Sequence, residues 1–416
     1  MESLFSYLTP RRKKNNRTVT EAEEGDVTNT MGNEKNHYNN EHHDGNRTTS
    51  VHFNKNLTAF VRTACEIGVT NLVKEFQELQ SYEQKHIKSH KAFGKNINKC
   101  RYKDILCYDD TRFILKKSRN DNLDFIHANY VGSSRKNSYI CTQAPLPDTV
   151  KDFWRMVWQS RARSVVMLCE IMENGKVKSE QYWPIDKSEI LRTGNMLIKF
   201  LNKYDFEKNI VRSNLLLKKG RRVRLVAHYQ YFKWPDRGVP SNYLVCLRLM
   251  KKVTKKFPVI VHCSAGIGRT GTVVCLDDMI TKLSKPGGCL RMKNALLEYR
   301  QYRYGIVQTE VQYLFIHRVL MTLAIQKNLI SMNEIAQFIK LYDIVMSKLC
   351  ENPAQKAEQL MQTQEEHTIL EKMEQVSEVT LEEVSAVPFD DDMKKKNNKG
   401  SRNNSFSDSE RNNGEN

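Results

Sequence analysis

Residues Pro258 to Gly271, PVIVHCSAGIGRTG, constrain the fold of this 416-residue chain more than any other segment. An apolar run leads into a loop of small residues, and a helix is predicted to begin near Thr270. This order aims successive backbone N–H groups and the positive end of a helix at one point, where an anion is expected to bind. The run from Val259 to Val261 is continuous rather than alternating, which is typical of a strand covered on both faces.

Other apolar runs extend this pattern along the chain. With turn signals around them, they predict strands at 138–142, 164–169, 222–232 and 257–262. Helical periodicity covers 60–84, 272–283 and 309–323. The sequence therefore predicts an α/β fold, a single domain in which a central twisted mixed sheet is flanked by helices.

Composition changes at both ends of this region. Residues 1–53 are rich in Asn, Thr, Glu, His and Lys and poor in large apolar residues, so we expect a disordered N-terminal extension. The folded domain should occupy 54–325. A helical C-terminal extension is predicted at 326–389, and its amphipathic part from Ile335 to Leu349 should pack on the domain rather than bind a partner. Residues 390–416 should form a disordered tail.

Positive charge is concentrated in the predicted domain. Residues 51–324 contain 48 Lys and Arg against 23 Asp and Glu, a net +25, whereas the whole chain carries +18. Such a field favours anionic partners. Nucleic acid, an acidic membrane surface and acidic phosphoproteins all fit, so charge alone does not choose among them.

The sequence also bears on the cellular compartment. No apolar run approaches the roughly eighteen residues of a membrane-spanning helix, and residues 1–14 lack the apolar segment of a signal peptide. The ten cysteines are scattered without a CxxC pair, which favours reduced thiols over disulfides or a zinc site. We therefore expect a cytoplasmic protein without a membrane span, while short basic runs at 11–14 and 394–396 leave a nuclear location open.

The loop after the strand at 257–262 combines an anion site with a nucleophile. Gly266 and Gly268 let the backbone wrap closely, and the planar fork of Arg269 can hold two phosphate oxygens. The same positive surroundings favour a thiolate at Cys263. The Cys-x5-Arg spacing outweighs the alternative that Cys263 is a small buried hydrophobe. His262, beside it, is expected to orient the loop.

The segment from His262 to Thr270, HCSAGIGRT, resembles the signature of the tyrosine-specific protein phosphatases. Other words of that family occur in the family's order over about two thirds of the chain: RYKD at 101–104, ANY at 128–130, QAP at 143–145, DFW at 152–154, QYWP at 181–184, WPDRGVP at 234–240 and QTEVQY at 308–313. The resemblance implies a cysteine-based, non-receptor protein tyrosine phosphatase domain. Such a domain hydrolyses phosphotyrosine in proteins through a phosphocysteine intermediate, with neither cofactor nor metal.

The resemblance assigns five catalytic positions. Cys263 matches the nucleophile, Asp236 the general acid on a mobile loop, and Arg269 the phosphate-binding arginine. Gln308 matches a glutamine that positions the attacking water, and Thr270 matches a hydroxyl that helps the thiolate leave.

Other positions match residues that bind substrate or support the site. The substrate-binding set is Tyr102, Asp104, Lys178, Gln312, Ser264, Ala265, Gly266, Ile267 and Gly268. Tyr102 would wall a pocket deep enough to favour phosphotyrosine, and Asp104 would bind the substrate backbone. Lys178 would contact the acid loop. The supporting set is Glu173, which braces the arginine, and Arg300 and Arg303, of which one supports the signature loop.

Two other function classes remain as alternatives. One is a phosphotyrosine-binding module without turnover, against which the matched Cys263 and Asp236 argue. The other is an RNA phosphatase with the same cysteine chemistry, which the net charge suggests. The RYKD motif, which implies a deep phosphotyrosine pocket, and the lack of an RNA-recognition motif disfavour it. We therefore expect phosphotyrosine proteins with acidic flanks as partners, and no nucleic acid. Arg237 departs from the family pattern, since many members carry an apolar or aromatic residue there.

Overall fold

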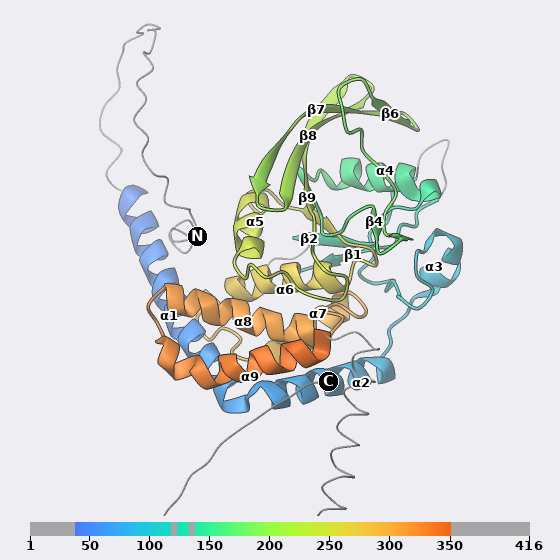
Figure 1. Ribbon diagram of the computed structural model, residues 1–416. Helices are drawn as coiled ribbons and strands as arrows, with labels where there is room; N and C mark the ends of the chain where they lie inside the picture. Colours follow the sequence, from blue (N-terminus) through green and yellow to red (C-terminus); the bar gives the residue numbers. More distant parts are fainter. Residues whose placement is uncertain (1–37, 118–122, 133–137, 351–416) are drawn as a thin grey trace, which may run out of the picture. The chain divides into compact units, whose positions relative to one another are not determined.

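Eight strands form one sheet, in the order β1-β2-β10-β3-β9-β8-β7-β6 (Figure 1). The computed structural model describes residues 38–117, 123–132 and 138–350. Strands β2, β10, β3 and β9 run parallel at the centre, and the pairs on both sides are antiparallel. The predicted α/β class with a mixed central sheet is confirmed. The strands are β1 (Ala128–Val131), β2 (Tyr139–Thr142), β3 (Ser164–Met167), β6 (Ile190–Thr193), β7 (Met196–Glu207), β8 (Ile210–Lys219), β9 (Arg222–Tyr231) and β10 (Val259–His262).

The central strands coincide with the predicted apolar runs. Every residue of β2, β3 and β10 is buried, as expected for strands covered on both faces. Strands β1, β6, β7 and β8 were not predicted. Strand β7 has register shifts at Phe200/Asn202 and Asp205/Glu207 in its pairing with β8, and much of it is exposed, unlike the central strands. A separate hairpin joins β4 (Met172–Glu173) to β5 (Lys176–Val177).

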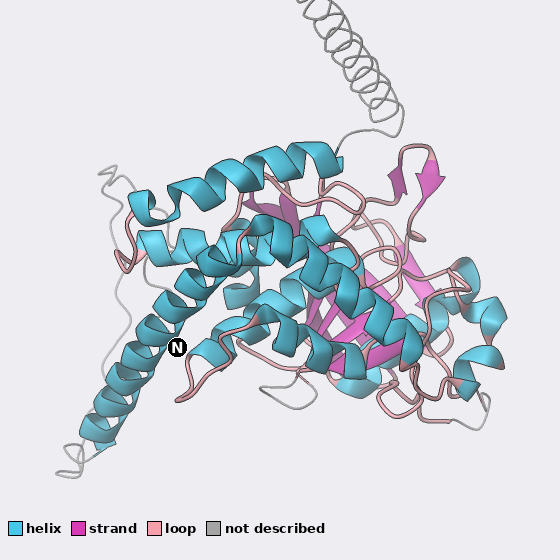
Figure 2. Cartoon of the chain, turned by 90° about the horizontal axis from the view of Figure 1, so that it is seen from below, coloured by secondary structure: helices cyan, strands magenta, loops and turns pink. Residues whose placement is uncertain are grey.

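Helices cover both faces of the sheet. In Figure 1, α4 lies on one side of the central strands and α6 on the other. Almost every residue of α6 is buried, because α5, α7 and α8 surround it. Figure 2 shows how several long helices cross one face of the sheet. The helices are α1 (Tyr38–Ile67), α2 (Val69–Lys85), α3 (Lys91–Gly94), α4 (Val150–Ser160), α5 (Val245–Val253), α6 (Gly268–Leu283), α7 (Met292–Tyr302), α8 (Glu310–Gln326) and α9 (Met332–Cys350).

The N-terminal helices differ from the sequence expectation in two ways. The helical pattern predicted at 60–84 belongs to two helices, because Gly68 between them adopts φ 76°, a left-handed conformation that breaks the helix. Helix α1 also begins at Tyr38, before the expected domain start at residue 54. Phe53 and Leu57, one turn apart, are fully buried in the core. Because the residues around this short apolar stripe are polar, the average composition of the segment did not indicate a buried helix.

Helix α9 contacts α2 and α8. Ile335, Phe338 and Tyr342 are buried there, so the amphipathic segment does pack on the domain. The rest of the predicted C-terminal extension and the tail, at 351–416, lies outside the described residues, as does 1–37. Among the helices that the structure describes, none is both long and apolar enough to cross a membrane.

Candidate active site

The signature loop connects β10 directly to α6. Cys263 follows the last residue of β10, and the helix begins at Gly268. Gly266 adopts φ +71°, and a Cβ atom on it would lie 1.9 Å from the carbonyl oxygen of Thr142 on β2. Glycine is thus required there by both conformation and space. The loop can fold tightly against the sheet only with this residue.

Arg303 holds the outer side of the loop. Its buried guanidinium donates to the carbonyl oxygens of Gly266 at 2.6 Å and Ala265 at 3.0 Å. In a trans peptide the N–H points away from the carbonyl, so the N–H groups of Gly266 and Ile267 face the inner side of the loop. Asn129 of β1 accepts from Arg303 at 2.7 Å and fixes its orientation. The loop is thereby preorganised as a cradle for an anion.

Arg269 in the first turn of α6 is clamped by Glu173. The two side chains form a bidentate pair, with Nη1–Oε1 at 2.5 Å and Nη2–Oε2 at 3.0 Å. The Trp234 carbonyl accepts from Nη1 at 3.0 Å. Burial alone would lower the pKa of Arg269, but the hydrogen bond to Glu173 raises it above its ordinary value. The guanidinium therefore remains charged although it is almost fully buried.

Asp236 lies between two cations, one of which is Arg269 of the signature segment. Its Oδ1 is 3.2 Å from Nη2 of Arg269, and its Oδ2 is 2.5 Å from Nζ of Lys178. Burial pushes the pKa of Asp236 upward, but the hydrogen bond from Lys178 and the charges of Arg269, Lys178 and Arg237 outweigh it and lower the pKa. The structure thus brings together Asp236, Arg269 and Lys178, three of the residues predicted for the site.

The loop that carries Asp236 is tied to the start of α8. Arg237 adopts φ 58°, and its carbonyl oxygen accepts from Oγ1 of Thr309 at 3.0 Å. Within the loop, Nε1 of Trp234 donates to the carbonyl of Gly238 at 3.0 Å. The side chain of Arg237 is exposed. The sequence did not single out Thr309, although it stands between the two predicted glutamines.

The glutamine segment lies against the first residue of α6. A Cβ atom on Gly268 would be 2.8 Å from Oε1 of Gln308 and 3.0 Å from Nε2 of Gln312. Oε1 of Gln312 accepts from the backbone N–H of Gln308 at 2.9 Å. Nε2 of Gln312 and Oγ1 of Thr270 are buried without a hydrogen-bond partner among the described residues. Arg300 donates to the carbonyls of Ile306 and Val307, so it holds this segment rather than the signature loop.

Tyr102 contacts the signature loop at Ser264. Oγ of Ser264 donates to the carbonyl of Lys178 at 3.1 Å, so the hydroxyl of Tyr102 donates to Oγ of Ser264 at 2.8 Å. Arg101 is turned inward and donates to the carbonyls of Ala144 and Pro145. Asp104 is exposed and makes no hydrogen bond or ion pair within the described part of the chain.

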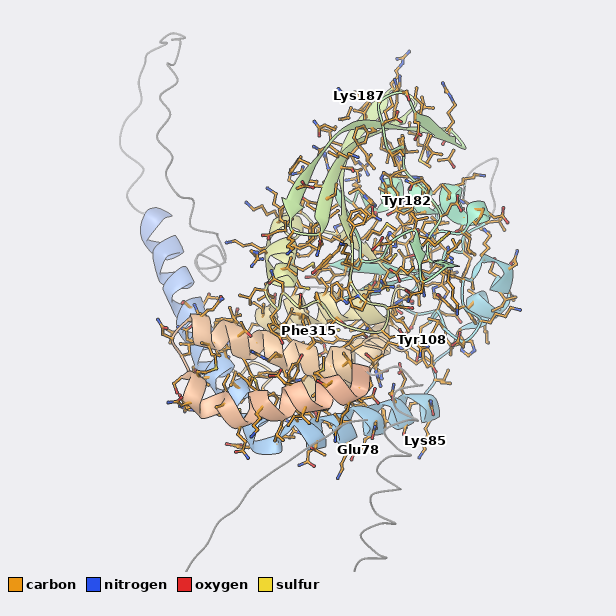
Figure 3. The ribbon with its side chains drawn as sticks, viewed as in Figure 1. Glu78, Lys85, Tyr108, Tyr182, Lys187 and Phe315 are labelled. Atoms are coloured by element: carbon orange, nitrogen blue, oxygen red, sulfur yellow. The ribbon has the colours of Figure 1, made fainter. Side chains whose placement is uncertain are left out.

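His262 belongs to a buried hydrogen-bond chain that the sequence did not predict. Burial lowers the pKa of His262 to about 4 and that of His228 to about 3, so both rings are neutral at physiological pH. Nδ1 of His262 lies 3.1 Å from the Cys263 carbonyl, which can only accept. Nε2 then accepts from the hydroxyl of Tyr182 at 2.7 Å, and Nε2 of His228 donates to that hydroxyl at 2.7 Å. Tyr182, labelled in Figure 3, thereby fixes the ring orientation of His262.

Comparisons with known proteins agree with this geometry. A family model described as protein-tyrosine phosphatase matches residues 96–322. The rat receptor-type tyrosine-protein phosphatase zeta is 38% identical over 250 residues, which are 56% of this chain and 11% of that protein. The Lar-like tyrosine-protein phosphatase of Caenorhabditis elegans is 36% identical over 251 residues, 58% of this chain and 11% of that protein.

A solved structure shows the same fold. The catalytic domain of human protein tyrosine phosphatase non-receptor type 18 superimposes with a TM-score of 0.59 at 32% identity, covering 64% of this chain and 99% of that domain. The matched sequence and fold make the chain a member of the protein-tyrosine phosphatase family. It spans about a tenth of the length of the first curated relatives that it matches.

Proposed function

We propose that the chain is an active protein tyrosine phosphatase in which Cys263 takes the phosphoryl group from phosphotyrosine. One observation carries the proposal. Nη2 of Arg269, in the first turn of α6, lies 3.2 Å from Oδ1 of Asp236, and the loop from Cys263 leads directly into that helix. A phosphate in the cradle would accept from the inward-facing N–H groups and from Arg269. Its ester oxygen would then face the carboxyl group of Asp236.

In the first step, the Cys263 thiolate attacks phosphorus as the bond to the tyrosine oxygen breaks. The leaving phenolate takes a proton from the carboxylic acid of Asp236. A bound phosphate dianion favours that protonated form, because it competes with Asp236 for Arg269 and places negative charge beside it. The products of this step are tyrosine, the Asp236 carboxylate and phosphocysteine.

In the second step, water attacks the phosphocysteine. Its proton goes to the Asp236 carboxylate, the S–P bond breaks, and inorganic phosphate leaves with the Cys263 thiolate restored. Gln308 and Gln312 lie against Gly268, where their amides can position that water. The otherwise unpaired hydroxyl of Thr270 can donate to the departing sulfur. This accounts for all five predicted catalytic residues.

The proposed substrates are phosphotyrosine segments of proteins. PTPN18, whose catalytic domain shares this fold, has been solved in complex with HER2-pY1248 phosphopeptides at 33% identity and a TM-score of 0.58. Tyr102, which is hydrogen-bonded to Ser264, would flank the substrate ring, and the exposed carboxylate of Asp104 would accept from a substrate backbone N–H. The exposed Lys103 and the positive domain favour acidic flanking residues.

We further propose that this activity operates in the cytoplasm. The mechanism needs a reduced thiol at Cys263. Nine of the ten cysteines are free thiols in the structure, although most of these are buried in an ordered core. Reduced thiols are typical of the cytosol.

Turnover of matched phosphotyrosine and phosphoserine peptides tests the proposal. We expect hydrolysis of the first and little of the second. Cys263→Ser should abolish turnover and retain phosphopeptide binding, because a neutral hydroxyl is a much poorer nucleophile than a thiolate. Phosphotyrosine binding without turnover by the unaltered chain would make it a binding module. Turnover retained by Cys263→Ser would remove Cys263 from the mechanism.

A further inference from the structure

A second concentration of positive charge lies in a groove remote from Cys263. The groove has a volume of about 1190 Å³, and its described lining contains nine lysine and arginine side chains and no carboxylate. They come from residues 116–117, from α4 and the turn after it, and from the β8–β9 hairpin; the β6–β7 turn completes the wall. None of these residues takes part in the proposed hydrolysis.

The sheet topology separates this groove from the active site. Strands β3 and β9 are parallel, and both start at the groove, with Arg163 just before β3 and Arg222 as the first residue of β9. Strand β9 ends near Trp234, whose carbonyl contacts Arg269. Ten residues of strand extend roughly 30 Å. The groove is therefore a separate site at the opposite end of the sheet.

Several cations of the groove have no carboxylate partner in the described part of the chain. Arg155 pairs with Asp152 at 2.8 Å. No ion pair with a described carboxylate is formed by Lys117, Arg161, Arg163, Lys219 or Arg222. The cations lie close enough to repel one another. Burial lowers the pKa of Arg224, and the neighbouring charges of Arg163 and Arg161 lower it further. An anion in the groove would relieve this repulsion.

The shape and lining of the groove indicate the class of anion. Cations converge on one hollow from several segments, which suits a compact ligand with charge on several sides. The planar fork of arginine matches phosphate oxygens. Trp158 is the only aromatic residue in the described lining, and the guanidinium of Arg224 lies 4.6 Å from its ring centroid. The guanidinium of Arg224 therefore already covers that face of the Trp158 ring. This disfavours the base stacking on which single-stranded nucleic acid binding depends.

We propose that this groove binds a compact anion bearing several phosphate groups, of the inositol polyphosphate class, either free or as the headgroup of a membrane lipid. Its volume is similar to those of the larger ligand sites in proteins. The site does not depend on the hydrolytic chemistry at Cys263, and a ligand could occupy it while substrate is turned over.

Titration of the full chain with inositol hexakisphosphate tests the proposal, with vanadate present to fill the signature loop. We expect saturable one-to-one binding. Lys117→Gln combined with Lys219→Gln should weaken it at least tenfold. Lys255→Gln combined with Lys256→Gln removes the same charge from exposed residues outside the groove lining and should leave the affinity unchanged. Without inositol hexakisphosphate, both double variants should hydrolyse a small aryl phosphate at the unaltered rate.

Vesicle binding distinguishes the two sources of the phosphates. Groove-dependent binding of phosphatidylcholine vesicles that contain a phosphatidylinositol bisphosphate would identify a lipid headgroup. Binding of the soluble compound without vesicle binding would identify a free ligand. The proposal is overturned by absence of saturable binding or by equal weakening in the two double variants. Tighter groove-dependent binding of poly-glutamate or single-stranded RNA than of inositol hexakisphosphate would also overturn it.

Discussion

At the scale of single residues, the state of Asp236 controls the proposed first step. Asp236→Ala should lower phosphotyrosine turnover by about 10² or more, because general-acid help typically supplies about 10² to 10⁴ in rate. Substrate affinity should change little, since Arg269 and the signature loop still bind the phosphate. Steady-state kinetics on a phosphotyrosine peptide measures both quantities.

An aryl phosphate with an acidic leaving group is the control for this variant. Its phenolate departs without much protonation, so Asp236→Ala should slow it far less. If both substrates lost rate equally, Asp236 would not be the proton donor. The variant should also retain phosphotyrosine proteins from a lysate, and vanadate should release them.

Lys178 provides a second residue-scale prediction, on pH dependence. It donates to Asp236 at 2.5 Å and lowers the pKa of that carboxyl. Lys178→Met removes this cation, so the pKa of Asp236 should rise and the acid should stay protonated to higher pH. The basic limb of the kcat/KM profile, which reports on the free enzyme, should therefore move to higher pH.

Lys176→Met is the matched control, since Lys176 lies exposed on the same hairpin and has no contact with Asp236. Its profile should coincide with that of the unaltered chain. An unmoved limb in Lys178→Met, or a shift toward lower pH, would contradict the assignment of that limb to Asp236.

At the scale of elements, Thr309 joins the acid loop to α8. Its Oγ1 donates to the Arg237 carbonyl at 3.0 Å and accepts from the Gln312 N–H at 3.3 Å. Thr309→Val removes both bonds, and one such bond is worth about 0.5–1.5 kcal/mol. We expect phosphotyrosine kcat/KM to fall about 3- to 10-fold.

Thr309→Ser keeps the hydroxyl and should restore most of the rate. Because Thr309 acts through the acid loop, the loss in Thr309→Val should be smaller for a substrate with an acidic leaving group. Equal losses on both substrates would indicate a structural defect of α8 instead.

The elements also show what sequence patterns can predict. The signature loop is local, so the spacing of Cys263, Gly266 and Arg269 was enough to predict an anion site there. Asn129 and Tyr182 act through Arg303 and His262, which are distant in sequence, and no local pattern shows such a pairing. Both residues belong to sequence motifs that resemble those of the family, ANY and QYWP, and this resemblance was the only indication of them in the sequence.

At the scale of the whole molecule, the charge of the domain is divided between two ends of one sheet. The end with the proposed active site holds Arg269 and Lys178, each paired with a carboxylate. The opposite end holds the groove, where several cations have no such partner among the described residues. The net charge of residues 51–324 can be counted from the sequence, but its location cannot, because the groove is assembled from four separate segments. A net charge predicts the sign of the charge on a binding partner. The chemical class of that partner depends on where the fold places the charged side chains.

The hydrophobic core extends beyond the residues that match the family, which end at residue 322, because α9 packs onto it. Ile335 and Ile344 both lie in α9, with 1% and 44% of their surface exposed. Ile335→Ala should lower the free energy of unfolding by about 2–5 kcal/mol, because it leaves a cavity in the core. Ile344→Ala makes the same change of helix propensity but should alter it by only about 0.5 kcal/mol. Urea unfolding of the full chain measures the difference. Equal midpoints for the two variants would mean that α9 does not contribute to the core, whereas a lower midpoint for Ile335→Ala alone would make α9 a structural part of the domain.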